Sequence, residues 1–440
     1  VCSAGPPTCD HSTIQAGINA AIAGDTVLVR SGHYTEQVTL HSDITLESTG
    51  GPDVTTITSV EGPAIMASDG VSLTVRGFNI SSLGTTSPTL GIDLANSEIT
   101  IANCIIGDLH GANGETGTPN GAPAIGVRFT EGGSLTVANL IIRDITGGNG
   151  LEGTSGGAIG GDAIGIWIDA VGSVAISGTT ISQLMGGAAG TEDRAYWCRG
   201  TGGRAIGVYA EGRTDLVFSH SRVADIAGGL PCIAGSDPCS QRAGAAIGIE
   251  AMGGTVILRD NRFADFSAWA GHDSEPSYAV HTSRTAGTYL ERNTVTSLST
   301  ATAGSLAREL KVLRPQSPAC PPAPGTVIGV ASEGDAVLRV TDSVLDTLTA
   351  VGIGQVIGIL VQDVGDATVT RNTVLNITGG SKPPVGIDIA NVGVADIDAN
   401  AVGKMRGGDA TRWYYGMIPT DAGSPVGIRL YSVTAAVRNN

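Results

Sequence analysis

The stretch GGDAIGIWIDAVGSVAISGTTI, residues 160–181, contains a pattern that recurs along this chain of 440 residues. In it a glycine between two aliphatic residues is followed, about ten residues later, by V-x-I and a small turn residue. Self-similarity of this kind is typical of a solenoid, in which each repeat stacks on the one before it. The repeated glycines are Gly126, Gly165, Gly207, Gly248, Gly329, Gly358, Gly386 and Gly427.

The composition favours narrow stacked coils. Apolar residues make up 41% of the chain and aromatic residues only 4%, so the core must be built from Val, Ile, Leu and Ala. We interpret the 65 glycines as tight turns and loops. The formal charge of −16 disfavours nucleic acid as a partner, because phosphate binding needs clustered cations. No apolar stretch approaches the length of a membrane span, so we expect no membrane insertion.

The first 25 residues differ from the rest and are predicted to form an N-terminal cap, followed by the solenoid over residues 26–440. A short helix is expected to begin after Ser12 or Thr13 as the N-cap and to stop at Gly24. It would cover the strand edges at the open end of the solenoid. The apolar face of this helix is predicted to consist of Ile14, Ile18, Ala21 and Ile22.

Three phrases carry a resemblance to a known family: TIQAGINAA at residues 13–21, GDTVLV at 24–29 and GHYTE at 32–36. They resemble the opening of right-handed parallel β-helix proteins of the pectin lyase-like superfamily, whose usual form is TIQ-A-AI-AA, GDT-V-V and G-Y-E. The resemblance implies an all-β fold, a right-handed single-stranded parallel β-helix with an N-terminal capping helix. This superfamily includes lyases, hydrolases, esterases, phage spikes and adhesins, so the resemblance leaves the chemistry open.

Long insertions separate the repeats. Successive repeated glycines are about 30 to 50 residues apart, longer than a bare coil, and the excess falls between the third strand and the next repeat. Equal phase in a solenoid means equal face, so we predict that the loops stack along one side and that function lies there. The insertions are residues 107–123, 147–161, 185–203, 228–244, 267–277, 299–325, 379–384 and 407–425.

A turn position after the second strand is often asparagine. Asn tolerates left-handed backbone geometry and hydrogen-bonds local backbone, so it suits a sharp turn and can form a ladder down the stack. Gly77, Gly178, Ser221 and Asp342 are variants of this position. The predicted structural ladder consists of Asn103, Asn139, Asn261, Asn293, Asn372, Asn400 and Asn439.

Seven cysteines indicate an oxidising, extracellular setting. The close pairs Cys2 with Cys9 and Cys232 with Cys239 are predicted disulfides, Cys198 and Cys320 are candidates to bridge long loops, and Cys104 is expected to be a buried thiol. Val1 does not begin a signal peptide, so we expect a mature secreted chain.

Catalytic motifs are weak. The sequences SHSR at residues 219–222 and RDNR at 259–262 lack an acidic cluster at matched phase and are interpreted as turn and surface positions. Glycoside hydrolysis needs paired carboxylates, which the GHD sequence at 271–273 lacks. We therefore predict no catalytic residue and no metal ligand. Calcium is the one cofactor left open, because the insertions are acidic but contain no D-x-D-x-D-G loop.

Aromatic residues in the insertions are the candidates for ligand binding. They could stack on sugar rings or on a neighbouring subunit, and the alternative is that they hold each loop against the coil below. With the adjacent polar residues, the candidates are Tyr196, Trp197, Trp269, His272, Asp273, Trp413, Tyr414 and Tyr415.

Three functions compete. The first hypothesis is a secreted structural or adhesive β-solenoid at the cell surface, whose subunits stack end to end into a filament. It rests partly on the last coil, which stops after its turn without a capping segment, so that either the chain has been trimmed or another subunit covers that end. The alternatives are a polysaccharide-active lyase or glycoside hydrolase and a non-catalytic carbohydrate-binding module.

Overall fold

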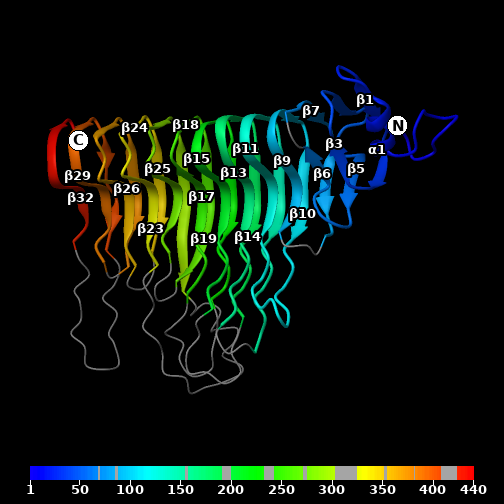
Figure 1. Cartoon of the computed structure of the whole chain (residues 1–440). Coiled ribbons are helices and arrows are strands. Elements are labelled where there is room, and N and C mark those ends of the chain that lie inside the picture. The colour runs from blue at the N-terminus through cyan, green and yellow to red at the C-terminus, as the bar shows by residue number, and fades with distance from the viewer. Residues whose placement is uncertain are drawn as a thin grey trace.

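The computed structural model describes residues 1–67, 70–84, 88–153, 157–190, 200–231, 242–270, 275–302, 325–350, 354–380, 382–407 and 424–440. In these residues the only helix is α1 (Ile14–Ala20), and almost all other regular structure is strand. The strands stack as successive coils of a right-handed parallel β-helix, with the two chain termini near opposite ends (Figure 1). The predicted fold class is confirmed.

The strands form two parallel sheets, here called sheet A and sheet B. Sheet A consists of β1 (Thr26–Val29), β3 (Val38–Leu40), β4 (Thr45–Ser48), β6 (Ile65–Ala67), β7 (Ser72–Arg76), β9 (Thr89–Ala102), β11 (Ala124–Ala138), β13 (Ala163–Ser177), β15 (Ala205–Ser219), β17 (Ala246–Met252), β18 (Thr255–Arg259), β20 (Ser277–Ser283), β21 (Gly287–Glu291), β23 (Val327–Glu333), β24 (Val337–Thr341), β26 (Val356–Gln362), β27 (Asp366–Thr370), β29 (Val385–Asp398) and β32 (Val426–Arg438). Sheet B consists of β2 (Gly32–Thr35), β5 (Thr55–Ser59), β8 (Asn79–Ser82), β10 (Ile105–His110), β12 (Ile141–Thr146), β14 (Thr180–Met185), β16 (Arg222–Ala227), β19 (Arg262–Ala270), β22 (Thr294–Thr302), β25 (Val344–Thr349), β28 (Thr373–Thr378), β30 (Ala401–Val402) and β31 (Met405–Arg406).

The repeated glycine marks a step in the ladder of sheet A. Between β11 and β13, Ile125 pairs with Ile164 and Val127 with Ile166, and the intervening glycine pair is skipped. A Cβ atom on Gly165 would lie 2.5 Å from the carbonyl oxygen of the next coil's glycine, so a side chain does not fit there. The step lets Ile164 face outward into a second apolar cluster, whereas Ile166 faces the interior.

The interior is filled by columns of aliphatic side chains in register, together with phenylalanine. All five phenylalanines of the chain are almost fully buried, and each contributes about 1.5–3 kcal/mol by leaving water. The sequence-based expectation that aromatic residues gather in the insertions therefore misses these inward positions. They are Phe78, Phe129, Phe218, Phe263 and Phe266.

Helix α1 caps the first coil. Thr13 Oγ1 accepts a hydrogen bond from Ala16 N at 3.2 Å, which makes Thr13 the N-cap. The Glu36 carboxylate accepts from the next free amides, Ile14 N at 2.8 Å and Gln15 N at 3.0 Å. The helix ends at Ala20, earlier than predicted, and Ile22 is 72% exposed, so its assignment to the buried helix face was wrong. Cys2 and Cys9 form a disulfide in this cap, and Cys198, Cys232, Cys239 and Cys320 lie outside the described residues.

The asparagines that were predicted to form one ladder at a single turn position belong to two adjacent columns, an outer and an inner one, so that prediction was wrong in this respect. Asn103, Asn139 and Asn439 occupy the first turn residue, where φ is 53°, 53° and 51°. The next residue of the turn points inward, and it is asparagine in five coils: the buried Asn261, Asn293, Asn372 and Asn400, and Asn440 in the last coil. Asparagine suits both positions, the first by tolerating left-handed geometry and the second by bonding backbone groups, so the sequence pattern merged them.

The inner column carries the hydrogen-bonded ladder. Asn372 Nδ2 donates to Val340 O at 2.8 Å and to Asn400 Oδ1 at 3.0 Å, while Asn372 Oδ1 accepts from Ser343 N at 3.0 Å. These bonds satisfy backbone groups that the turn leaves outside the strand ladders.

The insertions leave the β-helix on one side, as predicted. Each lies between a strand of sheet B and the next strand of sheet A, and their described parts project below the sheets in Figure 1. The sequence analysis interpreted the glycines of the insertions as turns and loops, and the structure corrects this. The segment that leaves sheet B and the segment that returns to sheet A are hydrogen-bonded to their counterparts in a stack, here called the glycine stack. Its central chain of bonds runs Gly148 N to Ala122 O, Gly161 N to Gly148 O, Gly187 N to Gly161 O, Gly203 N to Gly187 O, Gly229 N to Gly203 O and Gly244 N to Gly229 O, at 2.7–3.1 Å.

Close approach explains why the stack is made of glycine. A Cβ atom on Gly187 or Gly203 would lie 1.9 Å from the carbonyl oxygen of Gly148 or Gly161, respectively. Further bonds join like segments of successive coils, such as Gly150 N to Ala188 O at 2.8 Å and Gly160 N to Thr201 O at 2.9 Å. The stack therefore holds the bases of the insertions rigidly beside sheet A.

Cys104 is predicted to be unreactive in the folded protein. Its side chain is 1% exposed, and burial raises the pKa of its thiol to about 11, so the reactive thiolate is scarce at neutral pH. We expect iodoacetamide to leave Cys104 unmodified in native protein and to modify it fully in denaturant, as measured by peptide mass spectrometry. Rapid native labelling of the peptide that contains Cys104 would contradict this burial.

Candidate functional site

A column of polar and aromatic residues crosses the outer face of sheet A. Trp167 on β13, Tyr209 on β15, Glu250 on β17 and His281 on β20 occupy the same register on successive coils. The segments of the glycine stack that return to sheet A place Asp162 immediately before β13 and Arg204 immediately before β15. Together they form the outer-face cluster, which consists of Asp162, Trp167, Arg204, Tyr209, Glu250, Tyr278 and His281.

Arg204 joins two carboxylates within this cluster. Its Nη1 lies 3.2 Å from Glu250 Oε2 and its Nη2 lies 3.4 Å from Asp162 Oδ2. The other oxygen of Glu250 faces His281 Nδ1 at 3.6 Å. The side chains of Glu250 and His281 are only 12% and 18% exposed. Arg204 and Asp162 are 32% and 30% exposed, so only the part of the arrangement around Glu250 lies largely away from water, where charges interact more strongly than in surface ion pairs.

Two pairs of aromatic rings belong to the same cluster. The Tyr278 ring stacks on the His281 ring with centroids 4.5 Å apart, and Trp167 meets Tyr209 edge-on at 5.9 Å. Trp167 Nε1 and both ring nitrogens of His281 are buried without a hydrogen-bond partner among the described residues. Buried polar atoms of this kind are normally satisfied, so the cluster has unused hydrogen-bonding capacity.

The ionisation of the cluster limits its chemistry. Burial lowers the pKa of Arg204, but the Asp162 and Glu250 carboxylates outweigh it, and the pKa is raised overall. Burial, followed by neighbouring carboxylates, raises the pKa of Tyr209 and of Tyr278. Both phenols therefore stay protonated at neutral pH and act as hydroxyl groups. A tyrosinate acting as a general base is not supported by this environment.

A shallow groove adjoins the cluster on the same face. It has a volume of about 510 Å³ and is lined by Arg128, Thr130, Glu131 and Asp169, with Gly212 at one edge. Arg128 is held by Asp93 through two hydrogen bonds of 2.7 and 2.6 Å. Because Arg128 shares the register of Trp167, the groove and the cluster form one continuous surface along the coils.

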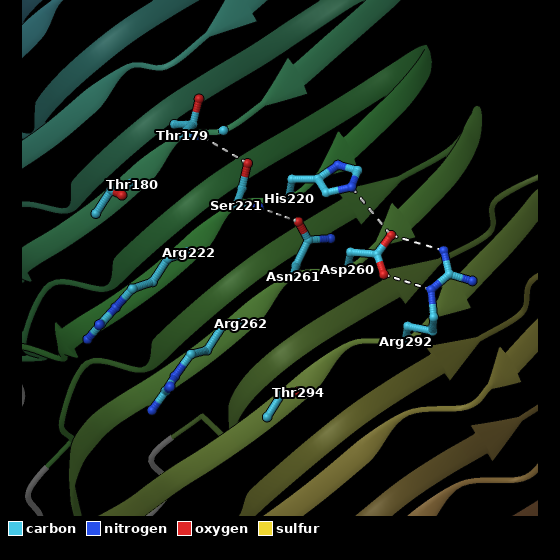
Figure 2. A pocket seen from close by; sticks show the side chains of 11 residues that line it. Thr179, Thr180, His220, Ser221, Arg222, Asp260, Asn261, Arg262, Arg292 and Thr294 are labelled. Carbon is cyan, nitrogen blue, oxygen red and sulfur yellow. Dashed lines mark hydrogen bonds and ion pairs between the residues drawn. The ribbon is translucent and has the colours of Figure 1, made fainter.

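A second groove lies at the turn between sheets A and B, and it is here called the turn groove (Figure 2). Its volume is about 540 Å³. It brings together the two charged motifs that the sequence analysis assigned to turn and surface positions. The lining residues used below are Thr180, His220, Arg222, Asp260, Arg262, Arg292 and Thr294.

The sequence-predicted ligand candidates stay predictions, because none of their side chains is among the described parts of the structure. Trp269 lies in β19, with its side chain outside the description. The other seven lie outside the described residues: Tyr196, Trp197, His272, Asp273, Trp413, Tyr414 and Tyr415.

The outer-face cluster was missed, although the sequence contained a signal for it. Trp167, Tyr209 and Glu250 each lie two residues after a repeated glycine, and His281 lies two residues after Ala279, which replaces that glycine. Aligning the repeats on the glycine would have placed all four in one column.

Within the described ranges, no group of three or more His, Cys, Asp and Glu side chains is placed to hold a metal ion. Calcium binding stays a prediction. Over the same ranges, no helix has the length and apolarity required to cross a bilayer.

No protein family model matches the chain, and neither does any curated protein. Several solved structures with a parallel β-helix fold of the pectin lyase-like kind are similar to it in fold. A GH136 lacto-N-biosidase from Eubacterium ramulus is 11% identical with a TM-score of 0.35, over 98% of this chain and 66% of that one, slightly less than two thirds. The A-module of the mannuronan C-5 epimerase AlgE4 from Azotobacter vinelandii is 11% identical with a TM-score of 0.28, and the match covers 96% of this chain and 94% of that one. PfbA, a surface adhesin of Streptococcus pneumoniae, is 10% identical with a TM-score of 0.27, and the match covers 97% of this chain and 86% of that one. Likenesses of this degree concern the fold alone.

Proposed function

We propose that this chain is an extracellular adhesive β-helix that binds a carbohydrate on the outer face of sheet A. The observation that carries the proposal is the outer-face cluster itself. It presents aromatic rings beside a carboxylate–guanidinium pair on a rigid scaffold, next to a groove that runs along the coils.

The chemistry of the cluster suits a sugar. A pyranose ring has apolar faces that pack on Trp167 and Tyr209, and hydroxyl groups that bond to carboxylate, guanidinium and imidazole. Arg204 is already neutralised by two carboxylates, so an uncharged sugar fits this site better than an acidic one.

A polysaccharide-active enzyme is the second candidate. The observation that favours it is the largely buried pair of Glu250 and His281, because a carboxylate beside an imidazole is a common acid–base arrangement. Against catalysis, one oxygen of Glu250 contacts Arg204 and the other faces His281, so neither is free to protonate a leaving group. We therefore propose carbohydrate binding as the first candidate function and catalysis as the second.

Extracellular location and self-association into a filament stay predictions. The first coil is closed by α1, and the edge of β1 is occupied by the N-terminal residue, with Val1 N donating to Leu28 O at 2.8 Å and Arg30 N donating to Val1 O at 3.0 Å. A filament would therefore not continue sheet A from one subunit to the next along β1.

Replacing Trp167 by alanine should weaken glycan binding about tenfold, or about 1.4 kcal/mol, because a stacking surface for the sugar is removed. The measurement is calorimetric titration with the best ligand from a panel of neutral polysaccharides. The matched control is Tyr289→Ala, which removes a half-buried ring elsewhere on sheet A that contacts Arg339. Equal losses in the two variants, or no glycan retained by the native chain, would overturn the proposal.

The same panel separates binding from catalysis. A binding protein is expected to release no reducing ends from these neutral polysaccharides, whereas a glycoside hydrolase would release them. If products appear, Glu250→Gln should abolish their formation while leaving ligand affinity within about tenfold.

A further inference from the structure

The turn groove holds two arginines that stand side by side. Arg222 on β16 and Arg262 on β19 pair in the register of sheet B, so their Cα atoms are opposite one another on neighbouring coils. Figure 2 shows the two side chains running parallel and in the same direction. Like charges directly opposite in a sheet repel, so this placement is unfavourable unless an anion lies between or beside them.

Among the described residues, a carboxylate of the protein contacts only one arginine of this pair. Arg222 has Asp265 at 3.8 Å, a distant and exposed contact, and no ion-pair partner of Arg262 occurs among the described residues. Asp260 is directed to Arg292, through bonds of 2.7 Å to Nε and 2.9 Å to Nη2. The Nε2 atom of His220 lies 3.6 Å from Oδ2 of the same carboxylate, which stands between His220 and Arg292 in Figure 2. Asp260, the acid that lines the groove, is therefore already paired with Arg292.

Hydroxyl groups continue the column on both sides of the arginines. Thr180 precedes Arg222 and Thr294 follows Arg262 in the same register, and both threonines line the groove. A hydroxyl, two guanidinium groups and a second hydroxyl thus follow one another along the axis at about 4.8 Å per coil. Guanidinium groups bind oxyanions through paired N–H donors, which threonine hydroxyls can supplement.

We propose that the turn groove is a binding site for the anionic groups of an acidic polysaccharide, with Arg222 and Arg262 as its main ligands. The coil spacing is close to the length of one sugar unit, so a chain lying along the axis would present its sulfate or carboxylate groups to the successive arginines. A single-stranded nucleic acid is disfavoured because no Phe, Tyr or Trp side chain lines the groove for a base to stack on. This site is separate from the outer-face cluster and does not depend on it.

The test is titration of the full chain with dextran sulfate, polygalacturonate, uncharged dextran and single-stranded DNA, at low and at physiological ionic strength. We expect dextran sulfate or polygalacturonate to bind more tightly than dextran, and the affinity for the acidic polymers to fall with salt. The sulfated and carboxylated polymers distinguish the two sources of the anion, and binding of either supports the site. Binding of DNA as tight as that of the acidic glycans would overturn the proposal.

Variants localise the binding. Arg222→Gln with Arg262→Gln should weaken binding at least about tenfold, because two charge-assisted contacts are lost. The control is Arg76→Gln with Arg143→Gln, which makes the same change in net charge at exposed arginines paired with Glu47 and Asp144. Equal weakening in both doubles would overturn the site, as would unchanged binding in the first. Circular dichroism confirms folding, and Trp167→Ala should leave dextran sulfate binding unchanged, so this test is independent of the carbohydrate site on sheet A.

Discussion

Replacing Asn372 by alanine is expected to lower the free energy of unfolding by about 3 kcal/mol. Asn372 is 1% exposed, and its amide bonds to Val340 O, Ser343 N and Asn400 Oδ1. Alanine would leave these buried groups without partners, and no water can reach them to compensate. Because a repeat array can open locally, amide hydrogen exchange over the coils that contain Val340 and Asn400 should be measured together with denaturant unfolding.

Two control variants make this result specific. Asn372→Ser should lose less stability, because serine already occupies the inner column at Ser221 and Ser343. Asn103→Gly should cost nothing or stabilise slightly, since Asn103 lies in the outer column at φ 53°, where Gly77 and Gly178 occur in other coils. A loss in Asn103→Gly as large as that in Asn372→Ala would show that the two columns are not distinct.

Replacing Gly203 by alanine is expected to cost about 3 kcal/mol or more by opening the glycine stack. The new Cβ atom would lie 1.9 Å from Gly161 O, so the two segments must separate and the bond from Gly203 N to Gly187 O must break. The damage should spread to Arg204, which follows directly and holds Glu250. We therefore expect faster amide exchange at Gly161, Gly187 and Gly229, together with weaker glycan binding.

Gly132→Ala is the matched control for this substitution. A Cβ atom on Gly132 meets its nearest neighbour at 3.5 Å, an ordinary contact, so stability should change by about 0.5 kcal/mol or less. Unchanged exchange protection in Gly203→Ala would mean that the segments are not packed as tightly as the structure places them.

The fold was predictable because every coil repeats the same solution. Val127, Ile166 and Val208 each occupy one inward column, and a pattern repeated this often leaves little freedom in register. The phase of the insertions followed from the same repeat, since equal positions in successive coils must share a face. The N-cap at Thr13 was also among the predicted alternatives, because capping depends on local residues.

Two local readings failed where neighbouring positions favour the same residue type. Asparagine serves both columns of the turn, and only the observed direction of the side chains separates Asn103 from Asn372. Glycine serves both turns and close backbone approach, so the glycine stack looked like a series of loops. In each case residue type alone does not indicate which physical demand it meets.

The order of residues along the chain was enough for the β-helix, its capped first coil and the side on which the insertions emerge, because these depend on periodic burial of small apolar side chains. The two candidate binding surfaces depended on the tertiary structure. Asp162, Arg204, Glu250 and His281 are far apart in sequence and belong to four different coils, and the same holds for Arg222 and Arg262 in the turn groove. Their proximity comes from stacking in register, which converts a separation of about forty residues into the spacing of neighbouring strands.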